Sequence, residues 1–307
     1  MPPTSNDFNE MLYRRLYLIR LFEETVIENF VKGVFYGTTH TCLGQEANAV
    51  GVLTGLAAQD IVFSNHRSHG HFLAYGGDPR SLFAELMGKA SGVCGGRGGS
   101  QHLHWRNFYS NGVQGGVAPV GTGMALAEKF KNSGAAAVVF LGDGTLGEGV
   151  LYETLNMAAL WQAPVLYVVE NNRIAQTTPV ELSLAGSIPA RFAAFGIPVG
   201  ELDTSDVTEI LPEAQARLSA ARNGEPQALI LHTCRFGPHS KGDDTRPTEA
   251  LAEMRCRRDP VTIQASRLEP SARLKIERET QAVIHAAFQA ALEDPFPTDL
   301  DLSENLK

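Results

Sequence analysis

A chain of 307 residues, 43% of them hydrophobic and 20% charged, is long enough to bury one sizeable core and too hydrophobic to be disordered. Its formal net charge of −8 argues against nucleic acid as the main partner. No apolar run reaches the length of a membrane span, and the N-terminus does not resemble a signal peptide. Four widely spaced cysteines without a Cys-x-x-Cys pair favour reduced thiols over a zinc site. We therefore expect a cytoplasmic protein without membrane contact.

The first third of the chain predicts helices around one short strand. Residues 7–32 have apolar positions spaced by three or four, which predicts a helix. A strand is expected at 61–66 and a second helix at 80–88. A glycine-rich loop follows at 92–102. Residues 118–131 are expected to form a helix whose small residues allow close packing against a neighbour.

The central part predicts a parallel sheet. Residues 135–141 and 163–170 are apolar and rich in β-branched residues, as buried strands are. The expected helix between them, at 148–161, makes the two strands parallel neighbours. This helix is apolar nearly all round, which predicts that it is buried, and a subunit contact is one way to bury it. Residues 197–202 and 227–236 supply two more strands.

The C-terminal part predicts one long helix, at about 271–292, followed by a polar tail at 296–307. We find no internal repeat and no low-complexity linker. The prediction is therefore a single α/β domain over residues 1–307, with a doubly wound, mostly parallel sheet and helices on both faces.

Polar clusters follow the two central strands. Gly142, Asp143 and Gly144 come after the first, and Asn171 and Asn172 come after the second. Ligands of open parallel sheets bind beyond the carboxyl ends of the strands, where a carboxylate and an amide oxygen could hold Mg²⁺ bridged to a phosphate. The stretch contains neither a P-loop nor a dinucleotide-binding fingerprint.

Seven motifs occur in a fixed order along the chain: IRLFEE (19–24), HTCLGQEA (40–47), HRSHGH (66–71), GRGGSQHL (96–103), the GDG…NN pair, RFGPHSKGDD (235–244) and RRDP (257–260). With them the sequence resembles the alpha subunits of the two-chain, thiamine-diphosphate-dependent 2-oxo-acid dehydrogenases. These are the decarboxylating components of the pyruvate, branched-chain and acetoin systems. The resemblance covers roughly residues 10–295 and implies the fold of a diphosphate-binding domain of the thiamine-diphosphate-binding class.

The resemblance implies a site for thiamine diphosphate and Mg²⁺. The Asp143 carboxylate, the Asn172 side chain and the backbone carbonyl of Ile174 would bind the metal. Arg67 would pair with the diphosphate, because a guanidinium forms strong charge-assisted hydrogen bonds to phosphate. The residues expected to contact the cofactor are His66, Arg67, Gly112, Gln114, Asp143, Gly144, Thr145, Asn172, Ile174 and His239.

Two histidines carry the expected catalytic roles. His239 matches the histidine of the family's active-site loop, and His40 matches a second histidine near the reacting carbon. A neutral imidazole can accept or donate a proton near neutral pH, which suits both positions. Arg235 falls on an arginine that supports the loop, and His66 stands where many members have tyrosine.

The chain departs from the family pattern in the cofactor pocket. Gln114 stands where members usually have a branched apolar residue that wedges under the cofactor. Either a neighbour such as Val113 supplies that wedge, or the pocket has changed. The loop after Ser240 also lacks the family's Tyr-Arg pair.

The resemblance implies an enzyme that works only with a second chain. The glutamate that activates the cofactor belongs to the beta subunit in this family, so we expect a beta-type partner in an α2β2 assembly. The implied reaction is decarboxylation of a 2-oxo acid, or cleavage of an acyloin such as acetoin, with the acyl group passed to a lipoyl acyltransferase. The alternatives are an acyloin synthase or split-transketolase-like carboligase without a lipoyl partner, and a non-catalytic assembly subunit.

Overall fold

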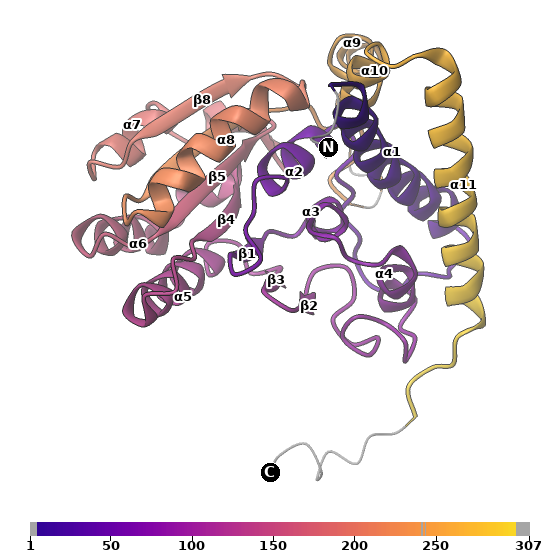
Figure 1. Ribbon diagram of the computed structural model, residues 1–307, viewed down its shortest axis with the longest axis horizontal. Coiled ribbons are helices and arrows are strands. Elements are labelled where there is room, and N and C mark those ends of the chain that lie inside the picture. Colours follow the sequence, from indigo (N-terminus) through magenta and orange to yellow (C-terminus); the bar gives the residue numbers. More distant parts are fainter. Residues whose placement is uncertain (1–4, 241, 243, 299–307) are drawn as a thin grey trace.

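The computed structural model describes residues 5–240, 242 and 244–298, and its centre is a seven-stranded sheet of order β2-β3-β1-β4-β5-β9-β8 (Figure 1). Every neighbouring pair is parallel except β2 and β3. The strands are β1 (Ile61–Ser64), β2 (His104–Trp105), β3 (Phe108–Ser110), β4 (Ala137–Gly142), β5 (Val165–Asn171), β8 (Val199–Asp203) and β9 (Gln227–His232). A small separate ribbon pairs β6 (Ile174–Ala175) with β7 (Thr178–Pro179).

Helices cover both faces of the sheet. On one face lie α5 (Val117–Lys131), α6 (Gly149–Leu160) and α7 (Ile188–Ala193). On the other lie α2 (Glu46–Leu53), α3 (Ser68–Tyr75), α4 (Pro79–Leu86) and α8 (Val207–Arg222), with α1 (Ser5–Phe30), α10 (Pro260–Ala265) and α11 (Pro270–Glu293) outside them. The remaining helices are α9 (Thr248–Arg258) and the short 3₁₀ turns Asp143–Gly147 and Val180–Leu182. This confirms the expected α/β fold with a doubly wound, mostly parallel sheet.

The central strands are buried on both sides. In β4, Val138 and Phe140 belong to the core on the α2 and α8 face, while Val139 and Leu141 belong to the core on the α5 and α6 face. Successive side chains of a strand point to opposite faces, so a strand between two layers of helices must be apolar throughout. That is why its sequence reads as one continuous apolar run.

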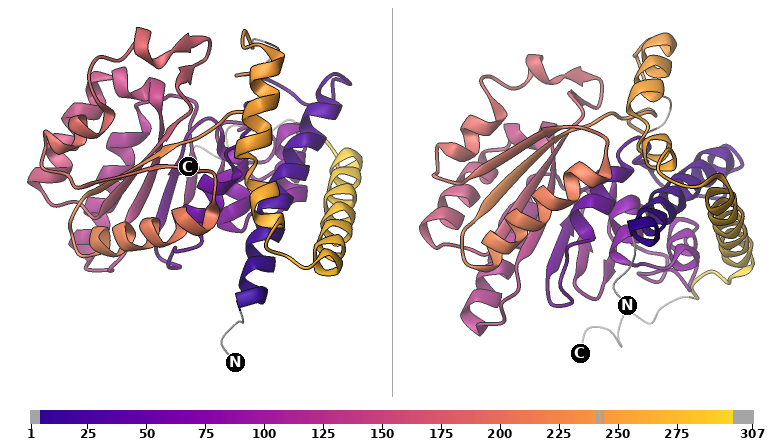
Figure 2. Two further views of the ribbon diagram at one scale, coloured as in Figure 1. Left: turned by 90° about the horizontal axis from the view of Figure 1, so that it is seen from above. Right: turned by 45° about the horizontal axis from the view of Figure 1, so that its top comes forward.

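The two terminal helices lie side by side away from the sheet (Figure 2). The expected bounds of 7–32 and 271–292 become Ser5–Phe30 and Pro270–Glu293. Arg20 of α1 is buried and bonds Glu46 of α2 at 2.7 Å and Asp259, just before α10, at 2.8 Å. This buried network joins the terminal layer to the sheet layer. Residues 299–307 of the expected polar tail lie outside the described residues.

Within the described part of the chain, no helix combines the length and the apolar character needed to cross a bilayer.

Candidate active site

A pocket opens at the carboxyl ends of β1, β4 and β5. Residues 65–67 follow β1, and residues 142–145 end β4 and begin the next turn. Glu170 lies near the end of β5, and Asn172 and Ile174 follow that strand. These three neighbouring strands are parallel, so their carboxyl ends meet at one edge of the sheet. His239, from the segment after β9, closes the pocket on a fourth side.

Asp143 starts the 3₁₀ turn after β4 and is buried. Its Oδ1 accepts a hydrogen bond from the Gly144 amide at 3.1 Å, while its Oδ2 is buried and has no hydrogen-bond partner among the described residues. Burial raises the pKa of Asp143 above its ordinary value, although the charges of Arg67 and Arg235 act in the opposite direction. A buried carboxylate oxygen of this kind fits a cation.

Gly144 lets the chain pass close to the β6 ribbon. A Cβ atom at Gly144 would lie only 2.8 Å from the Cβ of Ala175. Thr145 is buried directly after it and lines the same pocket.

The two asparagines after β5 have different surroundings. Asn171 hydrogen-bonds the ring of His232 at 2.9 Å, and its Oδ1 accepts the Arg173 amide at 3.0 Å, so it holds the end of the strand. Asn172 lines the pocket, where its Oδ1 accepts the Ile174 amide at 3.2 Å. Of the predicted pair, only Asn172 therefore faces the pocket together with Ile174.

Arg67 is a buried cation beside the pocket. It donates to the Thr41 carbonyl at 2.6 Å and to Nδ1 of His239 at 3.2 Å. Burial, together with the charge of Arg235, lowers the pKa of Arg67 to about 10, so it keeps its charge at neutral pH. Two buried guanidinium groups near each other are the electrostatic requirement of an anion site.

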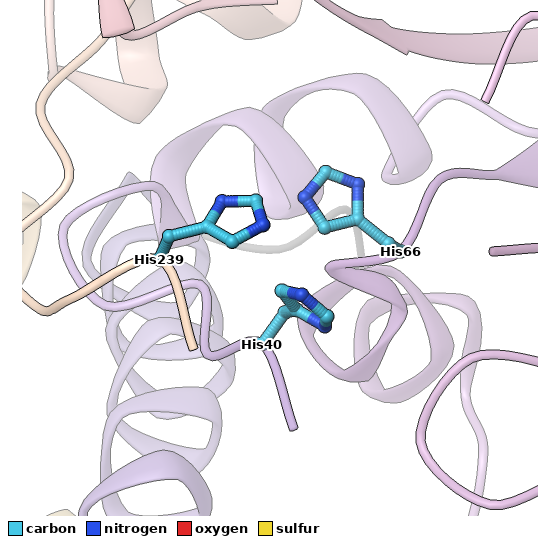
Figure 3. A group of neighbouring side chains, drawn as sticks. All are labelled: His40, His66 and His239. Carbon is cyan, nitrogen blue, oxygen red and sulfur yellow. The ribbon is translucent and has the colours of Figure 1, made fainter. Parts of the chain in front are cut away.

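Three imidazole rings face one another next to this cation (Figure 3). The ring centroids of His40 lie 4.8 Å from His66 and 4.7 Å from His239, and those of His66 and His239 are 5.4 Å apart. Burial lowers the pKa of His66 well below its ordinary value, and the charges of Arg67, His40 and His239 lower it further. His66 is therefore neutral at physiological pH.

The charge beside the histidine cluster argues against a zinc centre. The ring nitrogens lie within 4.8 Å of one another, which by itself permits a metal ion, since ligands about 2.0 Å from a tetrahedral zinc ion lie about 3.4 Å apart. Arg67, however, places a positive charge against His239. Hydrogen bonding to a polar organic ligand therefore suits the cluster better than a metal ion does.

The stretch that departs from the family pattern lies beside the cluster. Gln114 lines the pocket, and its Nε2 donates to the carbonyls of Asn111 at 3.2 Å and Gly112 at 3.3 Å. Val113 is 64% exposed and is not among the lining residues. Of the two alternatives raised by the sequence, the structure favours a changed pocket, because the polar Gln114 side chain occupies it. Gly112 is not among the lining residues either.

Several residues that line the pocket were not predicted from the sequence, among them Glu170 and Gln45. Glu170 accepts hydrogen bonds from Asn48 at 3.0 Å and from Asn65 at 2.8 Å. Burial favours its neutral form, but the His71 charge and these bonds outweigh that effect, so the Glu170 pKa lies below its ordinary value. The feature of the sequence that could have identified Glu170 is a carboxylate near the end of an otherwise apolar strand. Gln45, which also lines the pocket, stands within the HTCLGQEA motif.

Arg246, which was not predicted from the sequence as a site residue, holds the segment that carries His239. Arg246 donates to the carbonyl of Arg235 at 2.7 Å and to that of Gly237 at 2.8 Å. Arg235 itself is buried and donates to the Gln176 carbonyl at 3.3 Å, which ties the segment to the β6–β7 ribbon. Residues 241 and 243 of this motif lie outside the described residues.

Comparison with known proteins agrees with this geometry. The family model described as dehydrogenase E1 component matches residues 14–299. The pyruvate dehydrogenase E1 component subunit alpha of Zymomonas mobilis is 36% identical, over 98% of this chain and 89% of its own length. The subunit alpha of acetoin:2,6-dichlorophenolindophenol oxidoreductase is 36% identical in Cupriavidus necator and 35% in Bacillus subtilis, over 95% of this chain and 91% of each relative.

The family match spans most of the chain, and these relatives are alpha subunits covered along most of their own length. The resemblance stated from the motifs is thereby confirmed. The chain belongs to the dehydrogenase E1 component family of thiamine-diphosphate-dependent enzymes, as an alpha-type subunit.

Proposed function

We propose that this chain binds thiamine diphosphate through Mg²⁺ in the pocket described above, and that with a beta-type chain it decarboxylates a 2-oxo acid or cleaves acetoin. The observation that carries the proposal is the Asp143 carboxylate, whose buried Oδ2 has no hydrogen-bond partner among the described residues and shares a pocket with the buried Arg67. The charge of a second buried arginine, Arg235, also acts on Asp143. Such a pocket has a place for a cation and for an anion. A metal–diphosphate pair supplies both.

The residues present fit the cofactor's polar end. Asp143, the Asn172 side chain and the Ile174 carbonyl would hold Mg²⁺, because all three residues line the pocket and oxygen atoms are the ligands that Mg²⁺ prefers. Arg67 would pair with the diphosphate, while Gly144 and Thr145 would offer their amides to it. His66 and Gln114 line the same pocket and would contact the cofactor. Gly112 would contribute through the backbone that holds Gln114.

Bound thiamine diphosphate supplies an electron sink for cleavage of the bond next to a carbonyl group. This chain would position the substrate beside it with His40 and His239, whose rings are 4.7 Å apart. Their N–H groups would donate to the substrate oxygen on which negative charge develops, which lowers the barrier most when the donors are fixed in advance. His66, neutral at physiological pH, would add a polar ring without adding charge.

The proposal requires a beta-type partner. Two carboxylates line the described part of the pocket, Asp143 and Glu170. Asp143 is needed for the metal, and Glu170 is already bound by Asn48 and Asn65. The glutamate that activates the cofactor must then come from the partner, and we propose an α2β2 assembly that passes the acyl group to a lipoyl acyltransferase.

The test is calorimetric titration of thiamine diphosphate, with and without Mg²⁺, into the chain co-expressed with its beta-type partner. We expect binding that depends on Mg²⁺ and disappears in Asp143→Asn. Asp78→Asn is the matched control, because Asp78 caps α4 away from the pocket and asparagine caps equally well. Failure of the assembled wild-type pair to bind would overturn the proposal.

A second function, carboligation without a lipoyl partner, is favoured by Gln114, since a polar side chain lies where the family has an apolar one. The assembled enzyme should be given pyruvate with either lipoamide or a second carbonyl compound. Acyl transfer to lipoamide supports the dehydrogenase, and formation of an acyloin supports the carboligase. Reduction of 2,6-dichlorophenolindophenol with pyruvate or acetoin separates the two candidate substrates.

A further inference from the structure

Gln101 contacts one of the three clustered histidines. Its Nε2 lies 3.1 Å from Nδ1 of His40, and none of the roles assigned above involves this glutamine. A side-chain amide nitrogen carries only hydrogen-bond donors, so a ring nitrogen facing it must act as the acceptor. Nδ1 of His40 then has no proton, and in the neutral ring the proton resides on Nε2.

We propose that Gln101 is a positioning residue that fixes the tautomer of His40, so that His40 presents its Nε2–H group for the reaction. The inference rests on the proposed function, since it concerns the same site. It adds a residue and a protonation state that the family resemblance does not assign.

The surroundings of Gln101 hold its amide in place. Its backbone carbonyl accepts a hydrogen bond from the Ser110 hydroxyl at 2.9 Å. On the other side is Gly112, where an added Cβ atom would overlap the Gln101 side-chain oxygen. The absent side chain at Gly112 is therefore what leaves room for the amide.

The loop before Gln101 is held by one buried carboxylate. Glu85 accepts the amides of Cys94 at 2.7 Å and Gly96 at 2.9 Å through Oε2, and those of Gly98 at 2.6 Å and Gly99 at 3.0 Å through Oε1. Four backbone donors on one carboxylate fix the path of a glycine-rich segment that would otherwise be free to move. The position of the Gln101 amide is set by this anchor.

His239 also receives a hydrogen bond at Nδ1, but from a different donor. The Arg67 guanidinium lies 3.2 Å from Nδ1 of His239, and a guanidinium has no acceptor atoms. Both histidines that we propose to contact the substrate thus receive a donor at Nδ1 and carry the proton at Nε2. Paired N–H donors in fixed orientation suit stabilisation of a developing oxyanion.

The tautomer can be measured without activity. In the full chain labelled with ¹⁵N in its histidine rings, His40 is expected to show an unprotonated Nδ1 and a protonated Nε2, with its signals assigned from a His40→Asn variant. Two histidines serve as internal references of the opposite type. Nδ1 of His104 faces the Phe108 carbonyl at 3.3 Å, and Nδ1 of His69 faces the Glu23 carboxylate at 3.0 Å, so both carry their proton on Nδ1.

Two substitutions change the hydrogen bond without changing much of the shape. Gln101→Glu replaces the donor by a carboxylate, which should draw a proton to Nδ1 of His40. Gln101→Met removes the donor and should leave a mixture of tautomers. Gly112→Ala should displace the amide and give the same mixture from a different position in the chain.

Kinetics of the assembled enzyme give the second readout. We expect Gln101→Glu to lower kcat about 100-fold at neutral pH and to alter the pH profile, since a positioned proton donor contributes on the order of 10² to 10⁴ in rate. Gln101→Met should lose about tenfold, and the Kd of thiamine diphosphate should stay within about twofold of wild type in both.

A protonated Nδ1 of His40 in the wild type, or an unchanged tautomer in both Gln101→Glu and Gly112→Ala, would overturn the inference. If the wild-type pair failed to bind thiamine diphosphate, the proposed function would fall while the tautomer result stood, so the two failures are distinguishable.

Discussion

At Asp143, the buried carboxylate that the proposed metal site needs lowers the stability of the folded chain. The carboxylate is buried, and its pKa is raised because burial penalises the charged form. We predict that Asp143→Asn stabilises the chain without ligands by on the order of 1 kcal/mol, since substitutions that relieve a strained site commonly do so. Chemical denaturation should show this gain, and an unfolding free energy below that of wild type would contradict it.

The same variant should lose its response to ligand. Wild-type assembly at a Mg²⁺–thiamine-diphosphate concentration of 100 Kd should gain about 2.7 kcal/mol of stability, because a ligand that binds only the folded state shifts the unfolding equilibrium. Asp143→Asn should gain nothing. Thermal unfolding with and without the ligand pair measures both responses.

The lowered pKa of His66 predicts that the folded chain loses stability as the pH falls. Its pKa in the fold is well below 6.5, so between 6.5 and that lower value the unfolded chain binds a proton that the folded chain does not. Stability therefore falls as the pH falls through this window, by up to about 1.4 kcal/mol per pH unit. In His66→Gln this contribution is absent. Unfolding free energies of both proteins from pH 7 to pH 5 should diverge by that slope, and parallel curves would rule the explanation out.

At the scale of elements, helix α5 illustrates why small residues in a helix are informative. A Cβ atom at Gly121 would lie 2.6 Å from Cγ2 of Val139 on β4, whereas one at Gly123 would meet nothing within 4 Å. Both residues lie in the same helix, so helix propensity favours alanine equally at the two positions.

We predict opposite effects for the two alanine substitutions in α5. Gly121→Ala should destabilise the chain by about 1–3 kcal/mol, because it forces the helix away from the sheet. Gly123→Ala should stabilise it by about 0.5–1 kcal/mol through the lost flexibility of the unfolded chain. Urea denaturation of the two variants decides the matter, and a stabilised Gly121→Ala would show that α5 does not pack as closely as described.

The elements that could be predicted from the sequence are those whose burial leaves a regular pattern. The β4–α6–β5 unit was predictable because two apolar runs flank a helix of suitable length. Helix α2 was not, because all eight of its residues are buried, Glu46 and Asn48 included, so it shows no amphipathic period. Helix α8 was missed as well, and it contains Pro212.

The residues of the site also divide into those that the sequence predicts and those that it does not. Asp143 and Asn172 stand at strand ends, and the rule for parallel sheets places them together. The meeting of His40, His66 and His239 could be expected only through the family, since they come from three distant segments. The contact of Gln101 with His40 depends on a loop path that Glu85 sets through backbone amides, and backbone hydrogen bonds leave no pattern in the side-chain sequence.

At the scale of the whole molecule, two neighbouring helices each end in a large, exposed apolar side chain. Helices α5 and α6 pack side by side as an outer layer of the sheet, on the side away from α1 and α11 (Figure 1). Phe130 at the end of α5 is 79% exposed, and Leu160 at the end of α6 is 72% exposed. Large exposed side chains gathered on neighbouring helices are typical of a subunit contact, which agrees with the all-round apolar character of α6 in the sequence.

A charged substitution at the exposed end of α6 tests whether this helix contacts the partner. Leu160→Lys should weaken association with the beta-type partner at least tenfold, because burying a leucine contributes about 1.5–3 kcal/mol, while the unfolding free energy of the chain alone should change by less than about 0.5 kcal/mol. Leu274→Lys is the matched control: Leu274 is 56% exposed, on α11 at the other side of the molecule. Sedimentation of the co-expressed pair measures association. Equal effects of the two substitutions would mean that α6 does not form the contact, whereas loss in Leu160→Lys alone would place the partner beyond α5 and α6, on the face of the sheet opposite α2 and α8.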